Sequence, residues 1–180
     1  IAIRIEQIIL LPAIGLNFAC LSLTGQNYGA LKYDRIQEGY LVCLKYGLIL
    51  LVGGGLLIYF GAGYFMSIFT NDEKVIKIGI NYLQIAALFT PILAVLNISI
   101  ALMQGVKKPG FTVLISLFKE VVGAVIIIWL ICFYLNYQLK GIWFAMLITN
   151  YLSVIIFLFI VNNRMKSLGL EIFKKKLPSN

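Results

Sequence analysis

The stretch RIEQIILLPAIGLNFACLSLTGQNYGALKYDR, residues 4–35, shows how this chain is organised. No residue between Glu6 and Lys32 carries a formal charge. A helix of about twenty apolar residues crosses the hydrocarbon core of a bilayer, which is about 30 Å thick. The run closes with two glycines, an amide pair and a group of charged residues, which is typical of a helix that leaves the membrane and turns. The stretch therefore predicts a membrane-spanning helix followed by a short loop.

The composition extends this interpretation to the whole chain. The 180 residues are 61% hydrophobic and 12% charged, with a mean hydropathy of +0.96. A soluble domain is about 45–50% apolar and about 25% charged, so this chain has too few polar residues to cover a surface in water. Lipid is the expected solvent for most of it. The formal charge of +8 comes from cations beside the apolar runs and in the tail, so we expect no nucleic-acid partner.

Residue types that support metal or covalent chemistry are scarce. The chain has no histidine, and its three cysteines have neither metal-binding nor redox spacing. We therefore expect no enzymatic activity, no metal site and no bound cofactor. The chain starts at Ile1 without a basic leader segment, so we expect a fragment of a longer protein rather than a signal peptide.

Five long apolar stretches predict an all-α polytopic bundle of membrane-spanning helices. A proline–glycine pair at residues 109–110 marks the boundary between the third and fourth stretches. Three consecutive glycines at residues 53–55 predict close packing of the second span against a neighbour. The spans are expected near residues 3–23, 42–65, 79–104, 112–134 and 141–162, and residues 164–180 form a basic tail.

The distribution of cations predicts the orientation of the spans. Nine lysines and arginines border the spans on the side that holds the tail, against three on the other side. Because cytoplasmic loops are enriched in these residues, we expect the tail in the cytoplasm and the protein in a cytoplasmic membrane.

Arg4 and Glu6 are ionisable residues near the outer end of the first span. Such side chains are costly within a membrane and usually face protein or water. They form either an interfacial pair held by local contacts or part of an outward-facing cavity, where the Glu6 carboxylate binds a cation or a proton. Asn17, deeper in the same span, is a further candidate for the cavity wall. Pro12 either kinks this helix for packing or marks a flexing point.

The third and fourth spans also carry polar residues at depth. Thr90, Pro91 and Asn97 lie in the third span, where they either line a substrate path or bond between helices. Lys119 and Glu120 are adjacent in the fourth span and therefore point about 100° apart on a helix. Each is expected to meet a partner on another helix, in a structural or a gating role.

These features resemble the multidrug and toxic compound extrusion (MATE) transporters. Residues 4–35 are similar to the second helix of that family's C-terminal lobe, where an Arg–x–Glu precedes a helix that closes with Gly-Gln-Asn-x-Gly-Ala and a basic loop. Two later stretches, ISIALMQGVKKPGFTVLISLFKEVVG and LKGIWFAMLITNYLSVIIFLF, resemble further signatures in the same order. The signature positions are Gly25, Gln26, Asn27, Gly29, Ala30, Arg35, Gly105 and Pro109.

The resemblance implies a fold and a function. The family has twelve helices in two lobes around a central cavity, so the five spans correspond to helices eight to twelve. Helix seven and the N-terminal lobe of the same protein are then missing from this chain. The family exports small organic, often cationic, compounds in exchange for Na⁺ or H⁺. We expect Glu6 and the polar residues of the third span to line the cavity.

This chain also departs from the family pattern. Gln104 stands where many members carry arginine, Lys108 where aspartate is common, and Lys119 where an arginine is often found. No acidic residue lies between Lys77 and Lys107, so the cation-coordinating carboxylate of some relatives is absent from the third span. The coupling ion is therefore open. The alternatives to an antiporter are a lipid-linked oligosaccharide flippase of the same superfamily and a non-transporting truncated remnant.

Overall fold

The computed structural model describes residues 1–117, 121, 126, 129 and 138–167, and within these residues the regular structure is helical, without strands. Four helices among them are long and apolar enough to cross a membrane, namely α1, α2, α3 and the Gly141–Ser167 part of α5. The predicted all-α bundle is confirmed. The helices are α1 (Ala2–Gly29), α2 (Tyr33–Phe69), α3 (Glu73–Gly105), α4 (Pro109–Leu117) and α5 (Gln138–Ser167).

The helices continue beyond the predicted membrane spans. The first span is predicted to end near residue 23 and the second to begin near residue 42, whereas α1 ends at Gly29 and α2 begins at Tyr33. Apolar patterning marks the depth of the hydrocarbon, but backbone hydrogen bonding continues through polar residues until a turn interrupts it. α4 begins at Pro109, as predicted, and most of the fourth span and of the tail lies outside the described residues.

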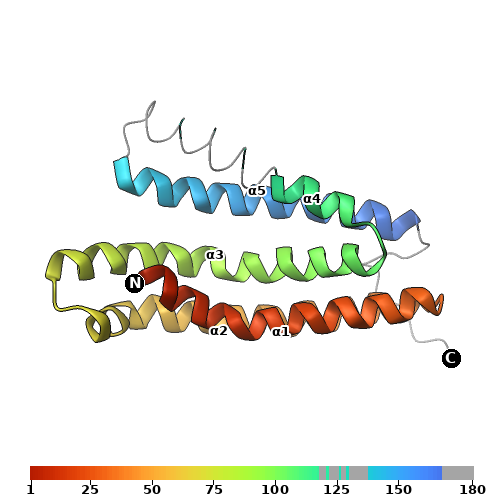
Figure 1. The fold of residues 1–180 in the computed structure, drawn as a ribbon, viewed down its shortest axis with the longest axis horizontal. Helices are drawn as coiled ribbons and strands as arrows, with labels where there is room; N and C mark the ends of the chain where they lie inside the picture. The colour runs from red at the N-terminus through yellow and green to blue at the C-terminus, as the bar shows by residue number, and fades with distance from the viewer. Residues whose placement is uncertain (118–120, 122–125, 127–128, 130–137, 168–180) are drawn as a thin grey trace.

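The helices run back and forth along one axis, and α3 lies between the others (Figure 1). α1 and α2 pack on one side of α3, and α4 and α5 lie on its other side. In the most apolar window of α3, 61% of the residues are buried within the protein, against 17% in α1. α3 is therefore the central helix, and lipid is the expected neighbour of most of the other surfaces.

The turn between α1 and α2 is a Schellman motif. The backbone N–H of Leu31 donates to the carbonyl of Tyr28 (3.2 Å), and that of Lys32 donates to the carbonyl of Asn27 (2.9 Å). Leu31 adopts the left-handed conformation, with a φ of 56°. α3 ends in the same way, with Lys107 at a φ of 58°.

The signature glycines at the end of α1 do not make this turn. The two glycines that close the first apolar run were expected to mark the turn, but neither has a positive φ, and a Cβ at either position would meet no atom within 4 Å. The left-handed residue is Leu31, two positions after Gly29. The composition therefore predicted the turn correctly, but it pointed to the wrong residue as the one in the left-handed conformation.

The glycines whose missing side chains permit close helix approach lie in α2 and α3, and Gly105 of α3 lies against the backbone of Gly25. A Cβ at Gly105, at the end of α3, would lie 2.6 Å from the side chain of Thr24 on α1. A Cβ at Gly55 of α2 would lie 3.0 Å from the backbone oxygen of Ala87 on α3. The packing expected for residues 53–55 is thus found at Gly54, which faces the side chain of Ile9 on α1, and at Gly55, whereas Gly53 has open space around it.

We predict that Leu31→Gly stabilises the protein. The left-handed conformation costs a leucine about 1–2 kcal/mol, which exceeds the 0.5–1 kcal/mol or so of chain entropy that glycine adds to the unfolded state. The melting temperature in detergent is expected to rise by about 2–4 °C. Leu31→Val is the matched control and is expected to lower it, because β-branching disfavours this conformation. If the melting temperature of the glycine variant falls, Leu31 does not have the left-handed conformation.

We also predict that Gly55→Ala is destabilising and that Gly53→Ala is not. The added methyl at residue 55 presses on a backbone oxygen, which cannot move as a flexible side chain can, at a cost of about 1–3 kcal/mol. The two variants make the same chemical change at positions two residues apart in α2. Equal melting temperatures for the two purified variants would show that α2 does not approach α3 at Gly55.

Candidate functional site

Glu6 is a buried carboxylate in the second turn of α1. Its side chain is only 8% exposed, whereas its neighbours Arg4 and Gln7 are exposed. The residue before it, Ile5, belongs to an apolar cluster built from α1, α2 and α3. A carboxylate in such surroundings has lost most of its hydration and must be compensated by polar partners or by a bound cation.

Tyr82 of α3 supplies one such partner. Its hydroxyl donates to Glu6 Oε2 over 2.6 Å, the length of a strong hydrogen bond to a charged group. α1 and α3 run in the same direction, so their first halves lie at the same end of the bundle (Figure 1). This arrangement places a tyrosine that follows Glu6 by 76 positions beside it.

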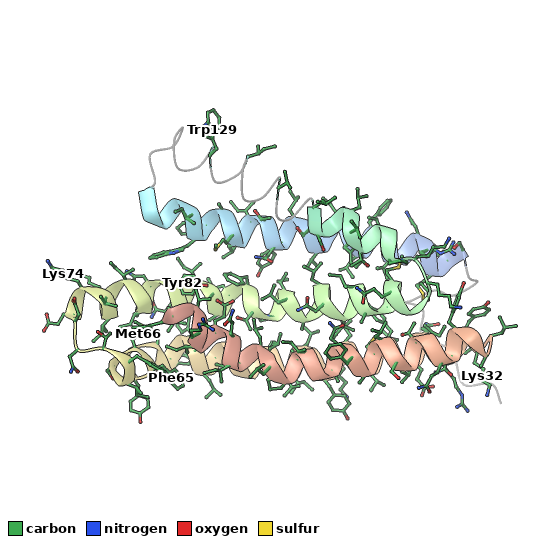
Figure 2. All side chains as sticks on the ribbon, viewed as in Figure 1. Lys32, Phe65, Met66, Lys74, Tyr82 and Trp129 are labelled. Atoms are coloured by element: carbon green, nitrogen blue, oxygen red, sulfur yellow. The ribbon has the colours of Figure 1, made fainter. Side chains whose placement is uncertain are left out.

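Trp143 of α5 completes the site. Its ring meets that of Tyr82 edge to face, with the centroids 6.1 Å apart and an angle of 69° between the planes. Trp143 is 8% exposed. Glu6, Tyr82 and Trp143 therefore bring α1, α3 and α5 together, and we call them the carboxylate–aromatic site. Figure 2 shows Tyr82 on the central helix, in the half of the bundle away from Lys32.

The chemistry of the carboxylate–aromatic site suits a cation. The carboxylate offers oxygen ligands, and the faces of tyrosine and tryptophan rings attract positive charge. Apolar surroundings strengthen both interactions by excluding water. Within the described residues no group of three histidine, cysteine, aspartate or glutamate side chains gathers as a metal site would require.

The other predicted cavity residues lie elsewhere. Asn17 and Asn97 are half-buried, and Arg4 is exposed. Thr90 is fully buried, and its hydroxyl donates to the carbonyl of Ala86 within the same helix (2.8 Å). The structure does not gather these residues around Glu6, and their role as a cavity wall stays a prediction. Lys119 and Glu120 lie outside the described residues.

Pro91 organises a second polar point on α3. Proline has no N–H, so the carbonyl of Ala87 receives no helical hydrogen bond. Gly55 of α2 faces this oxygen, and the hydroxyl of Tyr151 on α5 donates to the next carbonyl, that of Leu88, over 3.3 Å. The two carbonyls one turn before Pro91 therefore have protein neighbours on α2 and α5.

The family-signature residues mainly shape the ends of the helices. The Asn27 amide donates to the carbonyl of Leu23 (2.8 Å), and the Gln26 amide donates to the hydroxyl of Ser22 (3.1 Å). Gly105 receives the side chain of Thr24. Ala30 caps α1, Arg35 lies in the first turn of α2, and Pro109 opens α4. None of these residues reaches the carboxylate–aromatic site.

The sequence singles out Glu6 as a candidate but does not indicate that Tyr82 and Trp143 join it in one site. An ionisable residue inside an apolar run is visible from the sequence alone. An aromatic residue in a membrane span is common, and its partner depends on how the helices are rotated about their axes. The one signal in the sequence for such a partner is an aromatic residue at the same depth as the carboxylate.

We predict strong energetic coupling between Glu6 and Tyr82. Tyr82→Phe removes the donor to a buried carboxylate and is expected to lower the free energy of unfolding by about 1.5–3 kcal/mol. In a Glu6→Gln background the same change is expected to have less effect. Tyr151→Phe, which removes a longer hydrogen bond to a neutral carbonyl, serves as the control and should cost about 1 kcal/mol. Additive effects of Glu6→Gln and Tyr82→Phe would show that the hydrogen bond contributes no coupling.

Comparison with known proteins identifies the family to which this chain is similar. Residues 1–130 match the MatE family. The probable multidrug resistance protein NorM of Idiomarina loihiensis is 22% identical over 116 residues, which cover 64% of this chain and 25% of that protein. This chain therefore spans about a quarter of the length of that curated relative.

Solved structures of transporters share the arrangement of helices. An inward-facing multidrug resistance MATE transporter of the MOP superfamily superposes with a TM-score of 0.87 at 22% identity, over 93% of this chain and 39% of the other. A MOP-superfamily transporter from Pyrococcus furiosus superposes with a TM-score of 0.88 at 23% identity, over 94% of this chain and 38% of the other. The match over residues 1–130 of 180 shows that this chain belongs to the MatE family of multi-pass membrane transporters.

Proposed function

We propose that this chain forms part of a secondary active antiporter that exports organic, often cationic, compounds in exchange for Na⁺ or H⁺ by alternating access. The observation that carries the proposal is the buried Glu6 carboxylate, held by Tyr82 at 2.6 Å in a chain of the MatE family. A relative of this chain is described as a probable multidrug resistance protein. In this proposal the chain is not an enzyme and holds no permanent cofactor.

Competition at one carboxylate supplies the coupling. A charged Glu6 attracts an organic cation or Na⁺, and the rings of Tyr82 and Trp143 add an aromatic surface for an organic cation. Protonation of Glu6 removes the negative charge and with it most of the attraction. Tyr82 keeps the carboxylate in one orientation, so ion and substrate meet the same oxygen atoms. A proton or Na⁺ that enters from one side then displaces the exported compound.

Alternating access requires a second lobe. This chain covers 37–39% of three matched MATE-type structures, among them an inward-facing and an outward-facing conformation. We propose that the remainder of the protein supplies helix seven and the N-terminal lobe, and that the two lobes move about the cavity between them. The basic tail and the end of the bundle that carries Lys32 face the cytoplasm of a cytoplasmic membrane in this proposal.

The alternatives fit the described residues less well. A flippase for lipid-linked sugars requires basic residues where the anionic carrier binds. Arg4 and Lys45 are exposed, and the hydrogen-bond donor that holds Glu6 is the neutral hydroxyl of Tyr82. A non-transporting remnant gives no reason for a buried, hydrogen-bonded carboxylate, which lowers stability unless it is paired.

We predict that Glu6→Gln in the complete transporter abolishes coupled export. Glutamine keeps the size of the side chain but removes the charge that binds the cation. Efflux of a cationic dye from proteoliposomes is expected to slow by at least about tenfold, equivalent to 1.4 kcal/mol. Proton and Na⁺ gradients are imposed separately, and the gradient that drives the wild type identifies the coupling ion.

The control for this experiment is Glu73→Gln. Glu73 is an exposed carboxylate at the start of α3, at the same end of the bundle, and its neutralisation should leave efflux unchanged. Equal membrane levels and melting temperatures exclude a folding defect. Wild-type efflux and wild-type pH dependence in the Glu6→Gln protein would disprove the role of Glu6.

A further inference from the structure

One end of the bundle carries most of the positive charge of the described residues. α1, α3 and α5 end there, and α2 and α4 begin there (Figure 1). Figure 2 shows Lys32 at this end and Lys74 at the other. Two carboxylates, Asp34 and Glu38, share the end with six cations, whereas the opposite end has four cations and three carboxylates among the described residues. The six cations of the basic end are Lys32, Arg35, Lys107, Lys108, Arg164 and Lys166.

Two matching turns fix three of these lysines in place. Lys32 follows the left-handed residue of the first turn, and Lys107 is itself the left-handed residue of the second, with a φ of 58°. The N–H of Lys108 donates to the carbonyl of Met103 over 3.0 Å, which closes the second motif. Backbone hydrogen bonds therefore fix the conformation of the chain at these lysines.

The conformation of Lys107 points to a use for its side chain. A left-handed backbone has a steric cost for every residue type except glycine, and glycine is the usual residue at this position of the motif. Strained backbone of this kind concentrates at functional positions. Lys107 is exposed, and we found no contact within the described fold that requires a lysine there.

The two turns are neighbours in space. Gly105, two residues before Lys107, packs against Thr24 and the backbone of Gly25 on α1. The lysines of both turns are exposed, and so is Leu31, at 72%. In a membrane transporter this end lies where the helices leave the hydrocarbon. Exposed lysines on two neighbouring helix ends, with an exposed leucine in the first turn, match a lipid that has a charged headgroup and an apolar chain.

We propose that Lys32, Lys107 and Lys108 form a binding site for the phosphate headgroup of an anionic phospholipid. The ammonium groups contact the phosphate, and Leu31 contacts the upper part of the acyl chains. The site is independent of export at Glu6, because it lies at the opposite end of α1. Each lysine near an anionic membrane surface changes lipid affinity by about fivefold.

The test uses native mass spectrometry and lipid titration of the complete transporter in nanodiscs. Phosphatidylglycerol is the anionic probe, and phosphatidylcholine is the zwitterionic one. Lys107→Gln with Lys108→Gln is expected to weaken phosphatidylglycerol binding by about 25-fold and to leave phosphatidylcholine binding unchanged. Lys74→Gln with Lys77→Gln, at the other end, is the matched control and should retain wild-type selectivity. If both double variants lose phosphatidylglycerol affinity equally, the effect depends only on net charge, and the proposed site is wrong.

A single substitution separates charge from folding. Lys107→Gly places the preferred residue in the turn and removes one ammonium group. It is expected to raise the melting temperature while it lowers phosphatidylglycerol affinity about fivefold, so a lost lipid contact cannot be mistaken for a damaged fold. Unchanged lipid affinity in this variant would exclude Lys107 from the site. If millimolar inorganic phosphate displaces phosphatidylglycerol, the lysines bind a soluble anion, and the proposal of a phospholipid site is wrong.

Discussion

The burial of α3 between its neighbours is the constraint on which the other features depend. α3 contacts α1, α2, α4 and α5, and most of its apolar window is buried within the protein. Lipid tails are as apolar as leucine side chains, so close packing rather than the hydrophobic effect must hold such a helix in place. Gly55 and Gly105 provide this packing, because a methyl group at either would collide with a neighbouring helix.

The position of α3 also creates the carboxylate–aromatic site. Tyr82 lies on α3, which contacts both α1 and α5, so it can donate to Glu6 and meet the ring of Trp143 at once. A buried carboxylate is tolerated only where polar or cationic partners converge. The same packing that stabilises the bundle therefore brings the partners of Glu6 together, and a shift of α3 relative to α1 would change its surroundings directly.

The sequence predicted the local features of this fold and not its long-range contacts. The all-α bundle, the helix start at Pro109 and the exceptional position of Glu6 follow from hydropathy and residue type. The Tyr82 contact does not, because apolar residues surround each span and leave no stripe that would fix its rotation. Leu31 was missed for a different reason: composition points to glycine in a left-handed turn, and a backbone held by two hydrogen bonds accepted leucine.

The proline in α3 shows why the neighbouring helices have the residues they do. Pro91 leaves the carbonyl of Ala87 without a helical donor, and a bare carbonyl in hydrocarbon would cost several kcal/mol. Gly55 lets α2 come close enough to cover that oxygen, and Tyr151 of α5 donates to the carbonyl that follows it. A side chain at Gly55 would push α2 away and open the proline turn to lipid. The glycine in α2 and the proline in α3 therefore meet at the same carbonyl, and the two must be explained together.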